Sequence, residues 1–277
     1  MNPLVSTEWL AAHLNDVKVV DASWYMPDER REPAKEFLTE HIPGAVFFDI
    51  DGISDRITDL PHMMPAPDFF AASVSALGLS NGDTIVVYDG SGVFSAPRVW
   101  WALRSMGHEK VFVLDGGFPK WRAEGSAVAK WKREYPEPGS FLARPVATLA
   151  RDYDAVLRHL HNDDAQVLDA RSASRFTGEE KEPRVGLKSG HMPGATNIYW
   201  RSLLNHDNTL KDDQALQQVF AERGVDMRTP IVTTCGSGIS AAILMLALHK
   251  LGASDVALYD GSWAEWGGRD GAPVSTG

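Results

Sequence analysis

The sequence predicts an α/β fold made of two tandem domains, each a parallel sheet with helices on both faces. Three observations predict it. The chain repeats once, short β-branched runs alternate with helical patterns in each copy, and a stretch rich in proline and charge separates the copies. A chain of 277 residues, 44% of them hydrophobic, is long enough for two domains of ordinary size.

The repeat consists of four matched segments in the same order. "VVDASW" at 19–24 returns as "VLDARS" at 167–172, and "HIPGAVFF" at 41–48 as "HMPGATNI" at 191–198. "LGLSNGDTIVVYDGSGV" at 77–93 parallels "RGVDMRTPIVTTCGSGI" at 223–239, and "VFVLDGGFPKW" at 111–121 parallels "VALYDGSWAEW" at 256–266. This order predicts a duplicated domain, with copies at 1–124 and 151–277 and a linker at 125–150.

Hydrophobic patterns give the elements of each copy. Short apolar, β-branched runs predict buried strands at Val17–Val20, Ile85–Tyr88 and Val111–Leu114, and at Gln166–Leu168, Ile231–Thr234 and Val256–Tyr259. Longer patterns predict helices at Thr7–Leu14, Ala66–Leu77, Ala96–Ser105, Ala150–His159, Ala215–Glu222 and Ser240–Leu251.

The only cysteine, Cys235, follows the predicted strand Ile231–Thr234, at the sheet edge where such folds bind ligands. Gly236 and Gly238 allow the loop backbone to turn its N–H groups inward, and the next helix adds its positive N-terminal end. Both effects favour the reactive thiolate. The first copy has Asp89 at this position. A carboxylate and a thiolate both suit a site for one negative charge, whereas a buried apolar cysteine would not be exchanged so easily for Asp.

Other classes of function fit less well. A cysteine phosphatase needs His before the cysteine and Arg six residues after it, where this chain has Thr234 and Ala241. No His lies close to Cys235 in sequence, which weakens a Cys–His hydrolase. The net charge of −10 argues against a nucleic-acid partner, and no apolar run is long enough for a membrane span. A single cysteine and an N-terminus without a secretory pattern favour a reducing cytoplasm.

The motifs resemble the tandem-domain rhodanese-like sulfurtransferases, and within them the 3-mercaptopyruvate type. The resemblance rests on "HIPGA", "SAPRVWW", "LDGG", "EPR", "GHMPGA", "CGSGIS" and "YDGSWAEW", and it covers nearly the whole chain. Thiosulfate-type relatives have Arg and Lys directly after the cysteine, where this chain has Gly236 and Ser237. The usual mercaptopyruvate-type loop ends in Val-Thr, and here it ends in Ile239 and Ser240.

The resemblance implies a sulfurtransferase that uses no metal or organic cofactor. Cys235 would take sulfur from 3-mercaptopyruvate, release pyruvate and hold a persulfide until thioredoxin, a small thiol or cyanide accepts the sulfur. Arg175 and Arg184 would hold the carboxylate and keto oxygens of the donor. The loop residues Gly236, Gly238, Ile239 and Ser240 would line the persulfide site.

A proton relay is also implied by the resemblance. It would run from Ser237 to His62 and Asp51 of the first copy, and it would explain why a copy without its own cysteine is retained. His62 is equally well explained as a loop residue beside Pro61, and other aspartates near Asp51 could take its place: Asp49, Asp55 and Asp59. Arg171 is expected to pair with Asp169 and brace the loop.

Two alternatives remain open. The enzyme could prefer thiosulfate as donor, or the chain could be a non-catalytic binding module with an unreactive thiol.

Overall fold

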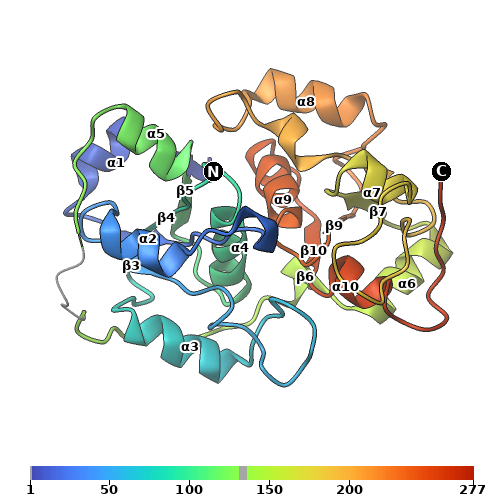
Figure 1. The fold of residues 1–277 in the computed structure, drawn as a ribbon, viewed down its shortest axis with the longest axis horizontal. Coiled ribbons are helices and arrows are strands. Elements are labelled where there is room, and N and C mark those ends of the chain that lie inside the picture. Colours follow the sequence, from blue (N-terminus) through green and yellow to red (C-terminus); the bar gives the residue numbers. More distant parts are fainter. Residues whose placement is uncertain (1, 131–135) are drawn as a thin grey trace.

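The computed structural model describes residues 2–130 and 136–277; residues 131–135 of the predicted linker lie outside the described residues. Each half of the chain forms a five-stranded sheet in which every pairing is parallel. The strand order is β1-β5-β4-β2-β3 in the first sheet and β6-β10-β9-β7-β8 in the second. The two sheets therefore share one topology, as the sequence repeat predicts (Figure 1).

The strands are short, and those at the sheet edges are shortest. The first sheet contains β1 Leu4–Val5, β2 Lys18–Asp21, β3 Val46–Phe47, β4 Ile85–Tyr88 and β5 Val111–Leu114. The second contains β6 Ala150–Arg151, β7 Gln166–Asp169, β8 Thr196–Asn197, β9 Ile231–Thr234 and β10 Val256–Tyr259. The predicted bounds of β4, β5, β9 and β10 are confirmed, and those of β2 and β7 differ by one residue.

Ten α-helices and three 3₁₀ helices are found in the described part of the chain. The α-helices are α1 Thr7–His13, α2 Pro33–Thr39, α3 Pro67–Ala76, α4 Ala96–Ser105, α5 Gly117–Ala123, α6 Tyr153–Asn162, α7 Ala173–Thr177, α8 Asp213–Ala221, α9 Ala241–Lys250 and α10 Ser262–Trp266. The 3₁₀ helices are η1 Pro27–Glu29, η2 Ala147–Leu149 and η3 Trp200–Leu203. Among the described residues, no helix has the length and apolar character needed to cross a membrane.

One predicted helix was placed too early. The sequence pattern put its start at Ala150, but Ala150–Arg151 pairs with β10 as an edge strand of the second sheet. Helix α6 then begins after Asp152, whose side chain accepts a hydrogen bond from the N–H of Ala155 at 2.8 Å. This N-cap fixes the start of the helix at Tyr153. Ala150, the last residue of the predicted linker, thus already belongs to the second sheet.

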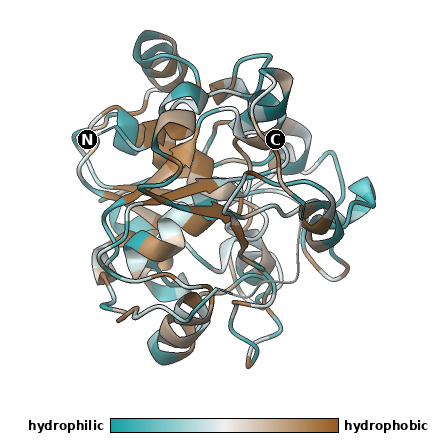
Figure 2. Ribbon diagram, turned by 90° about the vertical axis from the view of Figure 1, so that its left-hand side faces the viewer, coloured by the Kyte–Doolittle hydropathy of each residue, from teal (hydrophilic) through white to brown (hydrophobic). Residues whose placement is uncertain are grey.

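Both faces of each sheet are covered, because successive residues of a strand point to opposite sides. In β2, Val19 packs in a cluster with Leu10 of α1 and Trp121 of α5, and Val20 packs in the cluster that contains Val99 of α4. Figure 2 shows the hydrophobic strands enclosed by helices with more hydrophilic outer surfaces. The prediction of helices on both faces is confirmed.

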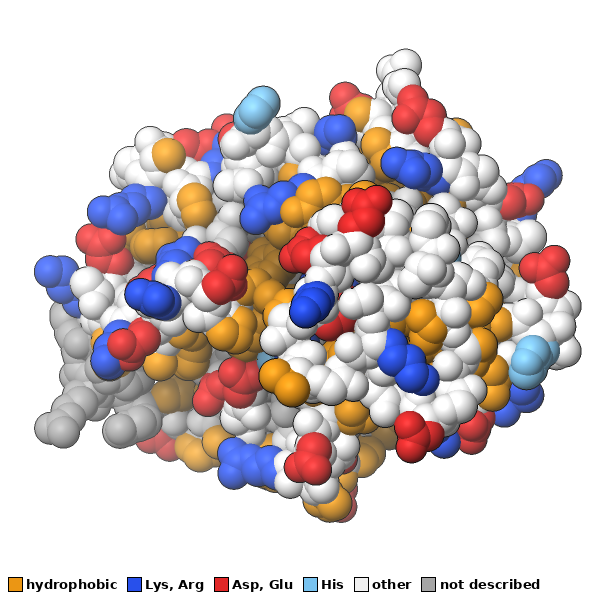
Figure 3. Space-filling view, turned by 45° about the vertical axis from the view of Figure 1, so that its right-hand side comes forward, with side chains coloured by type: hydrophobic (Ala, Val, Ile, Leu, Met, Phe, Trp, Pro, Cys, Tyr) orange, Lys and Arg blue, Asp and Glu red, His pale blue; other side chains and the backbone are white. Residues whose placement is uncertain are grey.

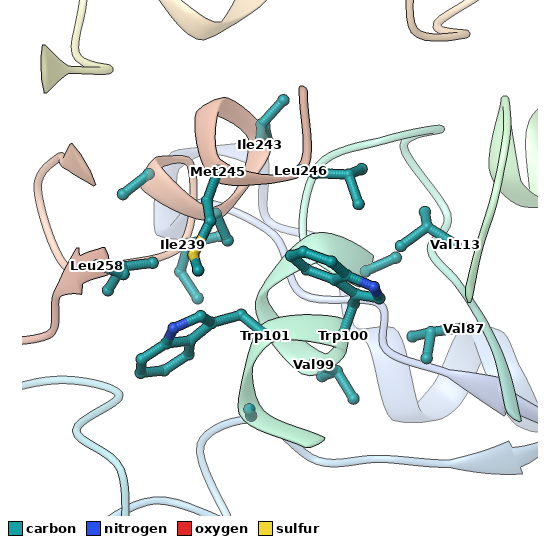
Figure 4. Close-up of a cluster of buried hydrophobic side chains, with 14 of the residues drawn as sticks. Val87, Val99, Trp100, Trp101, Val113, Ile239, Ile243, Met245, Leu246 and Leu258 are labelled. Atoms are coloured by element: carbon teal, nitrogen blue, oxygen red, sulfur yellow. The ribbon is translucent and has the colours of Figure 1, made fainter. Parts of the chain in front are cut away.

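Helices α4 and α9 lie side by side at the contact between the two domains (Figure 1). Trp100 and Trp101 of α4 lie with Ile239, Ile243 and Leu246 of the second domain in one buried cluster, in which Trp100 is close to Leu246 (Figure 4). Each of these helices follows the loop after its domain's central strand, β4 or β9. Their contact therefore brings the Cys235 loop close to the first domain.

Candidate functional site

Cys235 lies at the carboxyl end of β9, the central strand of the second sheet, and only 2% of its surface is exposed. The main-chain oxygens of Cys235 and Gly236 accept hydrogen bonds from the N–H groups of Trp263 and Ala264, both at 2.9 Å. The loop is thus fixed to the start of α10. The main-chain N–H of Gly238 donates to the Cys235 sulfur at 3.1 Å.

Two glycines give this loop its shape. Gly238 has φ of +79°, a left-handed conformation that strains any residue with a Cβ, and a Cβ there would also lie 2.7 Å from Nη1 of Arg98. A Cβ on Gly236 would lie 3.0 Å from Nη2 of Arg175. The absence of a side chain at position 236 therefore lets the Arg175 guanidinium rest against the loop.

The corresponding loop of the first domain holds a carboxylate in a ring of main-chain donors. Oδ1 of Asp89 accepts from the N–H of Ser91 at 2.8 Å, and Oδ2 accepts from those of Phe94, Ser95 and Ala96 at 2.8 to 2.9 Å. The fold thus concentrates N–H groups on an anion at this loop. This supports the idea that Asp89 and Cys235 occupy equivalent sites for one negative charge.

A cavity of about 480 Å³ opens beside Cys235 between the two domains. Trp24 and Phe94 of the first domain line one part of it, and Trp200 of the second domain lines another. Predicted site residues that line it are Cys235, Gly236, Ser237, Ile239, Ser240, Arg175 and Arg184. Gly238 touches the sulfur from the loop itself. Figure 3 shows acidic and basic side chains interspersed over one face of the molecule, around a recess with apolar side chains.

Arg171 is fully buried, and it braces the site as predicted. Its guanidinium donates to both carboxylate oxygens of Asp169, to Glu182 and to the main-chain oxygen of Gly190, and it lies over the ring of Trp263 at 4.2 Å. These contacts occupy most of the N–H donors and one face of the guanidinium. The predicted salt bridge with Asp169 is confirmed.

Arg175 and Arg184 differ in how they are held. Arg175 donates to Glu182 through Nε at 3.2 Å and Nη2 at 2.5 Å, so its position is fixed by an acid that it shares with Arg171. Arg184 has no ion pair or hydrogen bond among the described residues. Arg184 and Cys235 both line the cavity. Burial lowers the pKa of Arg184, while the charge of Cys235 acts in the opposite direction.

His62 and Asp51 form the predicted pair, although neither lines the cavity directly. Nδ1 of His62 lies 2.9 Å from Oδ1 of Asp51, and the Asp51 Oδ2 accepts from Nε1 of Trp24 at 3.1 Å. The His62 side chain is 4% exposed, and its ring meets Trp24 edge to face at 4.9 Å. Burial lowers the pKa of His62, and the nearby Asp51 only partly offsets this effect. His62 Nε2 is buried without a hydrogen-bond partner among the described residues, so the predicted contact between His62 and Ser237 is not formed here as a hydrogen bond.

Arg98 is a site residue that the sequence analysis did not identify. Its guanidinium forms a buried ion pair with Asp260 of the second domain at 2.7 Å, and it donates to the main-chain oxygens of His62 and of Gly238. The sequence feature that could have revealed it is a single arginine within the otherwise apolar helix motif "SAPRVWW". Trp24 and Trp200 were also missed, because nothing local in the sequence relates them to Cys235.

The cavity is basic within an acidic chain. Arg31, Arg171, Arg175, Arg184 and Arg201 line it together with one acid, Glu29, whereas the chain carries a net charge of −10. This concentration of positive charge suits small anions. Within residues 2–130 and 136–277, no cluster of three or more His, Cys, Asp or Glu side chains is arranged to hold a metal ion.

Comparisons with known proteins agree with this architecture. The family model for the rhodanese-like domain matches residues 6–124 and again 152–269. The chain is 44% identical to an Arabidopsis thaliana protein named thiosulfate/3-mercaptopyruvate sulfurtransferase 1, mitochondrial, over 99% of this chain and 78% of the relative. It is 43% identical to the 3-mercaptopyruvate sulfurtransferase of Escherichia coli strain K12, over 98% and 96% of the two chains.

A solved structure shows the same fold. The crystal structure of the Escherichia coli 3-mercaptopyruvate enzyme superposes with a TM-score of 0.87 at 40% identity, covering 96% of this chain and all of that one. The chain belongs to the tandem-domain rhodanese-like sulfurtransferase family.

Proposed function

We propose that the enzyme transfers sulfur from 3-mercaptopyruvate, through a persulfide on Cys235, to a thiol or to cyanide. The observation that carries this proposal is the combination of a loop-held thiol with Arg175 and Arg184 in one cavity. The neutral residues Gly236 and Ser237 leave the arginines as the cations that meet the donor. Two guanidinium groups suit a donor whose carboxylate lies several atoms from the sulfur that moves.

The first half-reaction begins with attack of the Cys235 thiolate on the substrate sulfur. A bond forms between the two sulfurs, the bond from sulfur to the substrate carbon breaks, and its electron pair leaves as the enolate of pyruvate. Arg175 and Arg184 stabilise the negative charge that develops on the keto oxygen. The enolate then takes a proton at carbon, and the outer sulfur keeps its hydrogen in the persulfide.

We assign the proton transfers to Ser237, His62 and Asp51. With its pKa lowered, His62 is neutral near pH 7 and can accept a proton, and Asp51 beside Nδ1 favours the tautomer with a free Nε2. The same histidine can return the proton to the enolate. This role supplies a physical reason for the first domain to remain joined to the catalytic domain.

The loop is well suited to hold the persulfide. In the first domain, the N–H groups of Phe94 and Ser95 bond to Asp89. Their counterparts in the second domain, the N–H groups of Ser240 and Ala241, have no acceptor among the described residues. The outer sulfur of a persulfide on Cys235 would find hydrogen-bond donors there, as the Asp89 carboxylate does.

A second donor, thiosulfate, is kept as an alternative because the Arabidopsis thaliana relative is named for both substrates. The test compares kcat/KM for the two donors, measuring pyruvate release with mercaptopyruvate and thiocyanate formation from cyanide with both. We expect a clear preference for mercaptopyruvate and no turnover by Cys235→Ser. A preference for thiosulfate would show that the neutral loop was misinterpreted, and no turnover with either donor would favour a binding module.

For the cellular location of the enzyme we propose a reducing compartment, the cytoplasm, because the lone thiol must stay reduced.

A further inference from the structure

Arg201 is a cation of the cavity that the proposed donor chemistry does not use. It lies in η3, its guanidinium covers the ring of Trp200 at 4.4 Å, and its side chain is exposed. No ion pair or hydrogen bond of this guanidinium is found among the described residues. Trp200 in turn packs against Phe94 of the first domain, with ring centroids 5.0 Å apart. The cation therefore rests on a fixed aromatic support.

The other cations of the cavity are either paired with an acid or assigned to the donor. Arg171 and Arg175 share Glu182, and Arg31 donates to both oxygens of Glu36 while covering the ring of Tyr25. Arg184 lacks a partner, but it senses the charge of Cys235 and lies where the donor must bind. This leaves Arg201 to meet a second anionic group in the cavity.

The size of the cavity agrees with a second ligand group. About 480 Å³ falls in the range of pockets that hold drug-sized molecules, whereas mercaptopyruvate is a three-carbon acid. In a reaction with a covalent intermediate, the first product leaves before the acceptor enters, so both substrates use the same cavity in turn. Asn208 also lines the cavity and offers an amide close to Gly92.

We propose that Arg201 and Asn208, which both line the cavity, form a subsite that recognises the carboxylate of a low-molecular-weight thiol acceptor. The proposal rests on the persulfide chemistry described above. In that step the acceptor thiolate attacks the outer sulfur of the Cys235 persulfide. A bond forms between acceptor sulfur and outer sulfur, the bond between the two sulfurs of the persulfide breaks, and its electron pair stays on Cys235. The transferred sulfur keeps its hydrogen, so no outside oxidant or reductant is needed.

The experiment separates the two half-reactions. The persulfide is first formed with mercaptopyruvate and measured by intact mass, and its discharge is then followed with mercaptosuccinate, which is anionic, and 2-mercaptoethanol, which is neutral. Arg201→Gln is compared with Arg201→Lys and with Arg223→Gln, which removes an exposed arginine that does not line the cavity. Each acceptor is compared across variants, so that its intrinsic thiol reactivity cancels.

We expect Arg201→Gln to form the persulfide normally and to raise KM for mercaptosuccinate about tenfold, the loss of one hydrogen bond to a charged group. KM for 2-mercaptoethanol should stay within about twofold, Arg201→Lys should recover part of the loss, and Arg223→Gln should resemble wild type. An equal change for both acceptors, or no change in KM for mercaptosuccinate, would overturn the subsite alone. Failure of the wild type to form a persulfide would overturn the proposed function and the subsite together.

Discussion

Arg98 of the first domain and Asp260 of the second form a buried ion pair, with 2.7 Å between Nη2 and Oδ1. The same guanidinium donates to the main-chain oxygens of His62 and Gly238. One side chain thus fixes the proposed proton relay relative to the thiol loop. Arg98 lies in α4, and α4 packs against α9. The ion pair is therefore part of the interface between the domains.

Arg98→Met should destabilise the protein, because it leaves the Asp260 carboxylate buried without its cation. We expect a loss of about 3–5 kcal/mol in the free energy of unfolding, measured with urea. The double variant Arg98→Met/Asp260→Asn removes both charges and should recover part of this loss. If both variants are as stable as the wild type, the ion pair is not a structural link between the domains.

Gly236→Ala should weaken donor binding rather than stability. Its Cβ would press on the Arg175 guanidinium, so we expect KM for mercaptopyruvate to rise several-fold, about 1 kcal/mol of binding. Gly82→Ala is the matched control, because a Cβ at Gly82 meets nothing within 4 Å. KM is measured from initial rates of pyruvate release. An unchanged KM in Gly236→Ala would show that Arg175 does not bind the donor.

The pH dependence of kcat/KM should report on His62 of the free enzyme. Because burial lowers the pKa of this histidine from 6.5, we expect kcat/KM to fall only when the pH is below 6.5. Asp51 raises the pKa of His62, so Asp51→Asn should move this acidic limb to lower pH still. It should also reduce kcat about 10- to 100-fold by weakening the relay. An acidic limb that stays in place in Asp51→Asn would exclude His62 as the titrating group.

Asp21 should make the stability of the protein depend on pH. The repeat matches Asp21 with Asp169 and Ser23 with Arg171, so Asp21 has a serine where Asp169 has its arginine partner. Burial raises the pKa of Asp21 from 3.8 to about 6. A raised pKa gives stability that is present below pH 3.8 and lost as the pH rises through 6.

Asp21→Asn should therefore gain stability relative to the wild type as the pH rises, by about 3 kcal/mol over the whole window. Urea unfolding of both proteins at pH 4.5 and pH 8 measures most of this difference. The same difference in unfolding free energy at both pH values would mean that Asp21 does not titrate in this range.

Much of the fold could be predicted from the sequence, because the central strands are buried on both faces. Ile85–Tyr88 and Ile231–Thr234 are continuous runs of β-branched and aromatic residues, and each is followed by a loop of small residues. The edge strands, such as Val46–Phe47, have only two residues, too few to show any alternation. The start of α6 was missed because Asp152 as N-cap competes with the apolar pattern that begins at Ala150.

The site could be predicted only where it is local or repeated. The Cys235 loop is contiguous, so its chemistry is visible in the order of residues, and Asp89 provided the comparison. The ion pair of Arg98 with Asp260 and the packing of Phe94 on Trp200 join residues more than a hundred positions apart. No periodicity or spacing in one sequence encodes such contacts, since they depend on how α4 and α9 pack.

The central claim is that Cys235 carries the transferred sulfur, and the intact mass of the protein tests it most directly. After incubation with 3-mercaptopyruvate and removal of excess donor, the wild type should gain the mass of one sulfur atom, and dithiothreitol should remove it. Cys235→Ser should gain nothing. No added sulfur on the wild type, or the same addition on Cys235→Ser, would contradict the account.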